Sequence, residues 1–229
     1  VVLAFTLTLM GMIGSVCIGQ PIDNRKYGQE DKFRQLEEIL PTPNGYRNAA
    51  GEPGPEYWQQ RADYVIDVTL DDDKQHLTGS EQVTYHNASP HTLRYLWMQV
   101  DANIFSPDSD ANKLHRNVPS EKLSIKGLER IFLRQSFDGS AKITRVQDAH
   151  GANLAHTIVK TMMRIDLPTP LPPGQDFKFS VDWHYAINDS KVLPGRTGYE
   201  YFESDRNYLY EIAQWFPRMV AFTDATGWQ

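Results

Sequence analysis

Residues 54–112 read GPEYWQQRADYVIDVTLDDDKQHLTGSEQVTYHNASPHTLRYLWMQVDANIFSPDSDAN, and this stretch decides the fold. From Arg61 onward, apolar and polar residues alternate in three runs, which are separated by turn-forming residues at 71–74 and 87–91. A period of two is typical of half-buried antiparallel strands, because successive side chains of a strand point to opposite faces. The stretch therefore predicts three consecutive antiparallel strands.

Each predicted strand has at least one apolar face. These faces consist of Tyr64, Ile66, Val68 and Leu70 in the first strand, Leu77, Val83 and Tyr85 in the second, and Leu93, Tyr95 and Trp97 in the third. The third strand is also apolar on its other face, at Leu96, Met98 and Val100. A strand that is apolar on both faces is expected in the middle of a sheet.

The rest of the chain continues the β pattern after an irregular stretch at 101–120. A short helix is predicted over 119–128, because Ser120-Glu121-Lys122 makes a suitable start. Further strands are expected at 141–147, 157–159, 163–165 and 177–187, with a turn at 148–151 and a proline-rich turn at 168–174. In the last of these strands, His184 alternates with the aromatic residues and is predicted to point away from the aromatic face. The predicted fold class is mainly β, a sandwich-like antiparallel β domain.

Residues 199–229 are dense in aromatic side chains. They admit two interpretations: a strand pair that finishes the sheet, or a loop that lines a cleft against a following domain. Aromatic density by itself fits both.

The N-terminal region has a different composition. Residues 1–20 are predicted to be a secretory signal peptide or a membrane anchor, because Val1 to Gly19 carries no charge and small residues follow its most apolar part. Residues 21–56 are predicted to be a linker with a short helical arm at 31–40, which ends at Pro41. The β domain is expected over 57–229. The protein is therefore expected to be exported, into the periplasm or the medium or onto a membrane, and Cys17 is a candidate for lipid attachment.

Composition excludes some functional classes. The chain has 229 residues, a formal net charge of −6 and 40% hydrophobic residues, enough for a core. The mild acidity and the absence of a long basic run argue against nucleic-acid binding. The acidic triplet Asp71-Asp72-Asp73 is interpreted as a solvated turn rather than a metal site. A single cysteine makes an intrachain disulfide impossible.

The usual catalytic motifs do not occur in these 229 residues. None of the seven histidines is followed by Glu, so the helical zinc motif H-E-x-x-H is absent, and His86 and His91 are interpreted as surface residues beside a turn. There is also no G-x-S-x-G elbow and no glycine-rich phosphate loop. We therefore predict no catalytic residue and no metal ligand within the chain.

Several ordered motifs resemble the aminopeptidase-N-like family of zinc metallopeptidases. They are YVIDVTL at 64–70, LTGSEQVTY at 77–85, LRYLW at 93–97, LPPGQ at 171–175 and AQWFPR at 213–218. The resemblance implies a saddle-like N-terminal β domain packed on a thermolysin-like catalytic domain. In that family the catalytic domain carries G-x-M-E-N and H-E-x-x-H, so the zinc ligands would lie outside this chain.

The resemblance also implies candidate substrate-binding residues. Gln214 matches the Gln of the family's T-Q segment, which borders the pocket for the first residue of the substrate, although Ala213 stands in place of Thr. Tyr210 and Glu211 are weaker candidates. The family's D-E-P after F-P has no counterpart here.

The expected function follows from the resemblance. The chain is interpreted as the N-terminal fragment of a secreted or periplasmic zinc aminopeptidase, inactive alone, that positions the amino terminus of a peptide against a downstream catalytic domain. The chain's end at Gly227-Trp228-Gln229 suggests an interrupted sequence. Membrane contact is expected only through the N-terminal segment. The alternative is a non-catalytic exported all-β module that binds a protein or a glycan.

Overall fold

The computed structural model describes residues 43–114, 124–193 and 197–229, and Pro43–Gln229 form one compact unit. The predicted signal segment, Cys17 and the helical arm at 31–40 lie outside the described residues. The predicted domain boundary at residue 57 stays a prediction. Among the described helices, none has the length and apolarity needed to cross a membrane.

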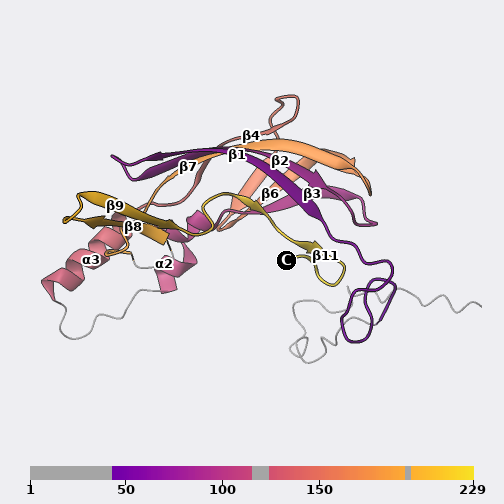
Figure 1. Ribbon diagram of the computed structural model, residues 1–229, viewed down its shortest axis with the longest axis horizontal. Coiled ribbons are helices and arrows are strands. Elements are labelled where there is room, and N and C mark those ends of the chain that lie inside the picture. Colours follow the sequence, from indigo (N-terminus) through magenta and orange to yellow (C-terminus); the bar gives the residue numbers. More distant parts are fainter. Residues whose placement is uncertain (1–42, 115–123, 194–196) are drawn as a thin grey trace, which may run out of the picture. The chain divides into compact units, whose positions relative to one another are not determined.

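The first sheet has four antiparallel strands (Figure 1). Its order is β1 (Arg61–Asp71), β2 (His76–His86), β7 (Asp176–Ala186) and β4 (Lys142–Asp148). β1 and β2 pair along their whole length, and the predicted turn at 71–74 joins them. The side-chain alternation in β7 also agrees with the prediction, because Phe179, Val181 and Trp183 are buried.

The second sheet contains the predicted third strand. Its order is β10 (Arg218–Met219), β3 (Leu93–Gln99), β6 (Met162–Leu171) and β5 (His156–Val159). β3 lies between β10 and β6, which confirms its predicted central position.

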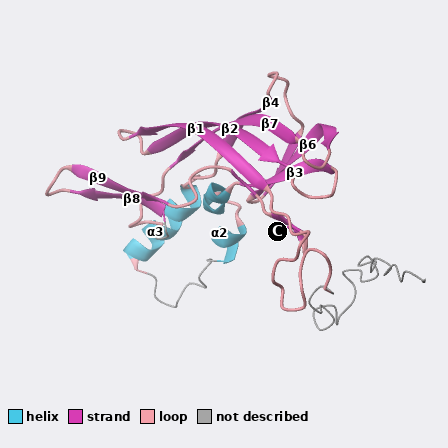
Figure 2. Ribbon diagram, turned by 45° about the vertical axis from the view of Figure 1, so that its right-hand side comes forward, coloured by secondary structure: helices cyan, strands magenta, loops and turns pink. Residues whose placement is uncertain are grey.

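The remaining elements are short (Figure 2). They are the hairpin of β8 (Thr197–Phe202) and β9 (Asn207–Ile212), the hairpin of β11 (Phe222–Thr223) and β12 (Gly227–Trp228), and the helices η2 (Asp101–Phe105), α2 (Asp110–Leu114) and α3 (Ile125–Ser136). The aromatic segment 199–229 therefore forms mainly separate hairpins, and only the two residues of β10 extend a large sheet.

One hydrophobic core joins the inner faces of the two sheets. Leu96, Met98, Met163 and Ile165 of the second sheet are fully buried, and they cluster with Val181 and Trp183 of the first. Two apolar faces packed in this way form a sandwich-like domain. The predicted fold class, mainly β and antiparallel, is confirmed.

Two predicted element boundaries are wrong. The helix expected over 119–128 is α3, which begins at Ile125, because the Ser124 hydroxyl accepts a hydrogen bond from the Gly127 N–H and caps it. The turn expected over 168–174 begins later, because β6 continues to Leu171. The register of β6 against β3 shifts there, so Pro168 and Pro170 lie outside the hydrogen-bonded pairs.

The stretch at 101–120, expected to be irregular, contains η2 and α2 within its described part.

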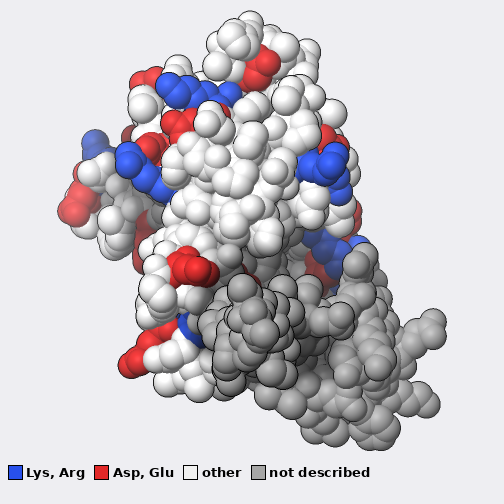
Figure 3. All heavy atoms as spheres, turned by 90° about the vertical axis from the view of Figure 1, so that its right-hand side faces the viewer, with Lys and Arg blue, Asp and Glu red and all other residues white. Residues whose placement is uncertain are grey.

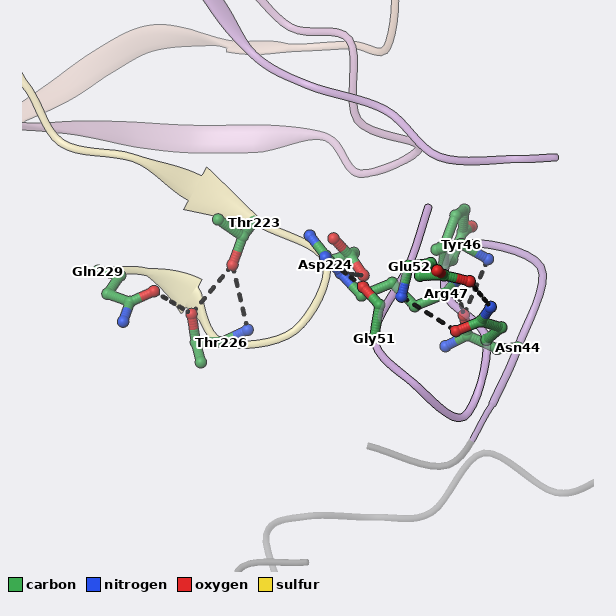
Figure 4. A network of polar contacts seen from close by, with 10 residues as sticks. Asn44, Tyr46, Arg47, Gly51, Glu52, Thr223, Asp224, Thr226 and Gln229 are labelled. Atoms are coloured by element: carbon green, nitrogen blue, oxygen red, sulfur yellow. Dashed lines mark hydrogen bonds and ion pairs between the residues drawn. The ribbon is translucent and has the colours of Figure 1, made fainter. Parts of the chain in front are cut away.

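Residues 44–52 are attached to the C-terminal hairpin (Figure 4). The Arg47 guanidinium donates to the Asp224 carboxylate at 2.8 Å, and it also donates to the Gly51 carbonyl at 3.1 Å. Asp224 and Tyr57 raise the pKa of Arg47 further, although its partial burial opposes them. This ion pair connects the two ends of the described chain.

Candidate functional site

The three residues predicted to bind substrate lie on and after β9. Tyr210 lies opposite Tyr199 in the β8–β9 hairpin, and its hydroxyl donates to the Asp72 carboxylate at 2.6 Å. Burial and the Asp72 carboxylate raise the pKa of Tyr210, so the hydroxyl stays protonated. Tyr210 therefore links the hairpin to the β1–β2 turn, and its polar group is already occupied.

Glu211 and Gln214 are more accessible than Tyr210. Glu211 pairs with Gly198, and its exposed side chain points away from the face that carries Tyr210. Gln214 is exposed in the turn after β9, with φ of 52°, in the left-handed region. Such a conformation is uncommon for a residue other than Gly, Asn or Asp, so the turn is held by its surroundings. The structure does not bring the three side chains together into one cluster.

Gln214 does border a recess. The recess is lined by β7, by the start of η2 and by the segment after β9, with Val100, Asp101, Ala102, Ala141, Trp183, Tyr185, Gln214, Trp215, Phe216 and Pro217. Its volume is about 10 Å³. This is room for roughly one water molecule, whereas pockets for small molecules have about 300–1,000 Å³. The recess as it stands cannot hold a peptide side chain.

Hydrogen bonds and ring contacts hold the segment after β9 in place. The Tyr185 hydroxyl donates to the Trp215 carbonyl at 3.1 Å, and the Trp183 and Trp215 rings lie 6.5 Å apart. The Met219 N–H donates to the Tyr64 hydroxyl at 2.8 Å. Arg218 forms an ion pair with Asp101 at 3.0 Å. The exposed Gln214 side chain thus projects from a fixed backbone, which is the property that a positioning residue needs.

Glu81 is a polar residue that the sequence analysis missed. It lies on the inner face of β2, fully buried, and neither carboxyl oxygen has a hydrogen-bond partner among the described residues. Burial raises its pKa to about 8. Its position could have been found from the strand period, because it shares its parity with Leu77 and Val83. It is not part of a group of three or more metal-ligating side chains, because the described residues contain no such group.

A second missed feature is an exposed apolar surface. We define the apolar surface as Ile125, Leu128, Phe132 and Leu133 of α3, all of which are exposed. Tyr201, Phe202 and Leu209 of the β8–β9 hairpin are exposed as well, with Tyr201 on one face of the hairpin and Phe202 and Leu209 on the other. Ile125 is 86% exposed and Phe132 61%. Figures 1 and 2 both show α3 next to the hairpin. Adjacent large apolar side chains in solvent are typical of a surface that binds another protein or domain.

Charged side chains are distributed differently from the apolar ones. Figure 3 shows one face on which basic and acidic side chains lie near each other around a largely uncharged area. Ion pairs such as Arg145 with Asp182 at 2.7 Å and Arg164 with Asp166 at 2.8 Å show the same mixing. On the described part of that face there is no continuous basic patch of the kind that binds nucleic acid.

Comparison with known proteins gives distant structural similarities. No family model and no curated protein matches the chain. The M1 zinc metallopeptidase from Deinococcus radiodurans is 15% identical, with a TM-score of 0.36 over 62% of this chain and 24% of that one. A mutant of it bound to a Tyr-Ser-Ala substrate is 14% identical, with a TM-score of 0.36 and the same coverage. The chain thus spans about a quarter of the length of these structures.

Proposed function

We propose that the chain is the N-terminal β domain of an exported zinc aminopeptidase of the aminopeptidase-N-like class. In this proposal the zinc ligands and the catalytic base lie in a further domain outside these 229 residues. The β domain packs on that domain and helps to position the amino terminus of a peptide substrate.

The observation that carries the proposal is the apolar surface. α3 exposes Ile125, Leu128 and Phe132 at helical spacing, and these side chains have no covering partner within the described unit. Their burial would release about 25 cal/mol for each Å² of apolar area removed from water. The order and spacing of the five sequence motifs support the same interpretation, because they point to a domain that works against a catalytic partner.

Gln214 has the positioning role in this proposal. It is exposed beside a recess too small for a peptide side chain. A catalytic domain placed against this edge would enlarge the enclosed space and would make Gln214 part of its wall. The Gln214 amide can both donate and accept, so it can bind either the amino group or the first carbonyl of a peptide.

The experiment tests the apolar surface on the full 229-residue chain. The wild-type chain is expected to bind an apolar fluorescent dye or to self-associate, because the apolar surface is open. The double variant Ile125→Lys, Phe132→Lys should bind less dye than wild type while its melting temperature stays within a few degrees, since both residues are exposed. Val65→Lys is the matched control, because Val65 is 68% exposed on the outer face of β1, away from the apolar surface.

The result that counts against the proposal is equally clear. A monomeric wild-type chain that binds no more dye than the double variant would show that the apolar surface is not available for docking. A loss of dye binding in Val65→Lys equal to that in the double variant would place the exposed surface elsewhere.

A further inference from the structure

Two histidines from neighbouring strands meet on the outer face of the first sheet. His76 lies in β2 and His184 in β7, and the register places Thr78 opposite His184 and His76 opposite Ala186. The two histidines are therefore diagonal neighbours. The outer face is the one opposite Leu77 and Trp183, which are buried in the core. The prediction that His184 points away from the aromatic face is confirmed.

The geometry of the two rings is close. The His184 Nδ1 atom lies 3.2 Å from the His76 Nε2 atom, and the ring centroids are 5.1 Å apart. Both side chains are half-buried, so water can reach the pair. The imidazoles thus share one hydrogen bond, with one ring nitrogen of each directed at the other.

We propose that His76 and His184 form a two-histidine binding site for Zn²⁺. Zinc binds imidazole nitrogen at about 2.0–2.1 Å with tetrahedral angles, which puts two nitrogen ligands about 3.3–3.4 Å apart. The observed separation of 3.2 Å differs little from this value. Two metal–nitrogen bonds would replace the hydrogen bond between the rings, and the ring that donates this hydrogen bond would carry its proton on its other nitrogen instead. Water would fill the two remaining positions.

The charges around the pair allow a cation to bind. Asp71 lies opposite His76 in the register of β1 and β2, and its carboxylate adds negative charge although Lys74 binds it at 2.8 Å. Lys142 lies opposite His184 in β4, and its ammonium is bound to Asp138 at 2.6 Å. Both nearby cations are therefore already paired with carboxylates.

This site differs from the zinc of the proposed function, since both of its ligands lie within the chain. The described residues hold no group of three or more metal-ligating side chains, so His76 and His184 would act as a pair. Two imidazoles on rigid neighbouring strands bind more tightly than one, because the second bond forms within the same molecule. Borderline-soft ions such as Zn²⁺ suit imidazole, whereas Mg²⁺ and Ca²⁺ prefer oxygen.

The test is a calorimetric titration of the full 229-residue chain with Zn²⁺. We expect one site, weakened at least about tenfold in His76→Gln and equally in His184→Gln, because either variant leaves a single imidazole. His150→Gln is the matched control, since His150 lies in the exposed turn after β4, and it should bind like wild type. Thermal melts of each variant without metal check that the sheet is intact.

A second readout separates ligation from a structural role. Substoichiometric Zn²⁺ should perturb the imidazole NMR signals of His76 and His184 together and leave those of His150 unchanged. Equal zinc affinity in wild type and in both single variants would overturn the proposal, and the two residues would then be a hydrogen-bonded pair only. The same conclusion would follow if Mg²⁺ perturbed the two signals as strongly as Zn²⁺ does.

Discussion

At the scale of single residues, Glu81 places an ionisable carboxyl between the two sheets. Burial raises its pKa from 4.5 to about 8. Between these values the unfolded chain ionises Glu81 while the folded protein keeps it neutral. The contribution of Glu81 to the stability of the folded state is therefore fully present below pH 4.5. This contribution is lost as the pH rises through 8. Each pH unit in this window costs about 1.4 kcal/mol.

The substitution Glu81→Gln removes this titration. The difference in the free energy of unfolding between Glu81→Gln and wild type should change in favour of the variant as the pH rises from 4.5 to 8.5. We expect this change to be at most about 3–5 kcal/mol. Urea denaturation at a series of pH values measures the difference. Glu203→Gln is the control, because Glu203 is exposed in the β8–β9 turn and should give a flat difference. A flat difference for Glu81→Gln as well would show that Glu81 is not buried as described.

The sequence predicts residue parity well in β2 and β7 but not at the end of β1, where Val68 and Leu70 of the predicted apolar face are exposed. Alternation correctly placed Val83, Tyr85 and Val181 in the core and His184 outside it. The same parity predicts that Glu81 faces the core, whereas a charged carboxylate is expected at the surface. In the folded protein Glu81 is buried in the core. The meeting of His76 with His184 could not be predicted, because it depends on the register of β2 against β7, two strands that are far apart in the chain.

At the scale of elements, α3 depends on its N-terminal cap. The Ser124 hydroxyl accepts from the Gly127 N–H at 3.1 Å, and four apolar side chains of the helix are exposed, so tertiary contacts give α3 little support. Ser124→Ala is expected to destabilise the helix by about 1 kcal/mol. Hydrogen exchange of the α3 amides should become several-fold faster, with the sheet amides unchanged. Ser124→Asp keeps an accepting oxygen and should retain slow exchange; equally fast exchange in both variants would contradict the role of the cap.

Element boundaries were harder to predict than element types. The start of α3 was placed too early because Ser120 and Ser124 are both suitable caps, and only tertiary structure selects between them. Pro168 and Pro170 suggested a turn, yet β6 accommodates them where its register against β3 shifts. In the first case a helix was predicted correctly but its start was not, and in the second a turn was predicted where the strand continues to Leu171.

At the scale of the whole molecule, Arg47 and Asp224 connect segments that are 177 residues apart. The Asp224 side chain is only 4% exposed, so removal of its partner leaves a nearly buried carboxylate unpaired. We expect Arg47→Gln to lower the melting temperature by about 2–4 °C or more. Arg61→Gln removes the exposed pair with Asp63 and should leave the melting temperature unchanged. Equal effects of the two substitutions would show that the Arg47 pair is no stronger than an ordinary surface pair.

The candidate site shows how far the sequence alone can go. Gln214 was selected by its match to a family motif, and the structure places it beside a recess, but the other walls come from η2, β7 and Ala141. These segments come together only in the folded protein, so no local sequence pattern predicts the recess. The apolar surface was also missed, because the helical period of α3 indicates an apolar face without showing whether that face is covered.

The central claim is that this β domain belongs to a zinc aminopeptidase, and the reading frame beyond the codon for Gln229 tests it most directly. Sequencing of the source gene in that direction should show G-x-M-E-N followed by H-E-x-x-H with a more distant Glu. The encoded protein should then remove amino-terminal residues from peptides and lose that activity to a zinc chelator. A stop codon directly after Gln229 would contradict the claim, and the chain would then be a binding module in which Gln214 has no catalytic partner.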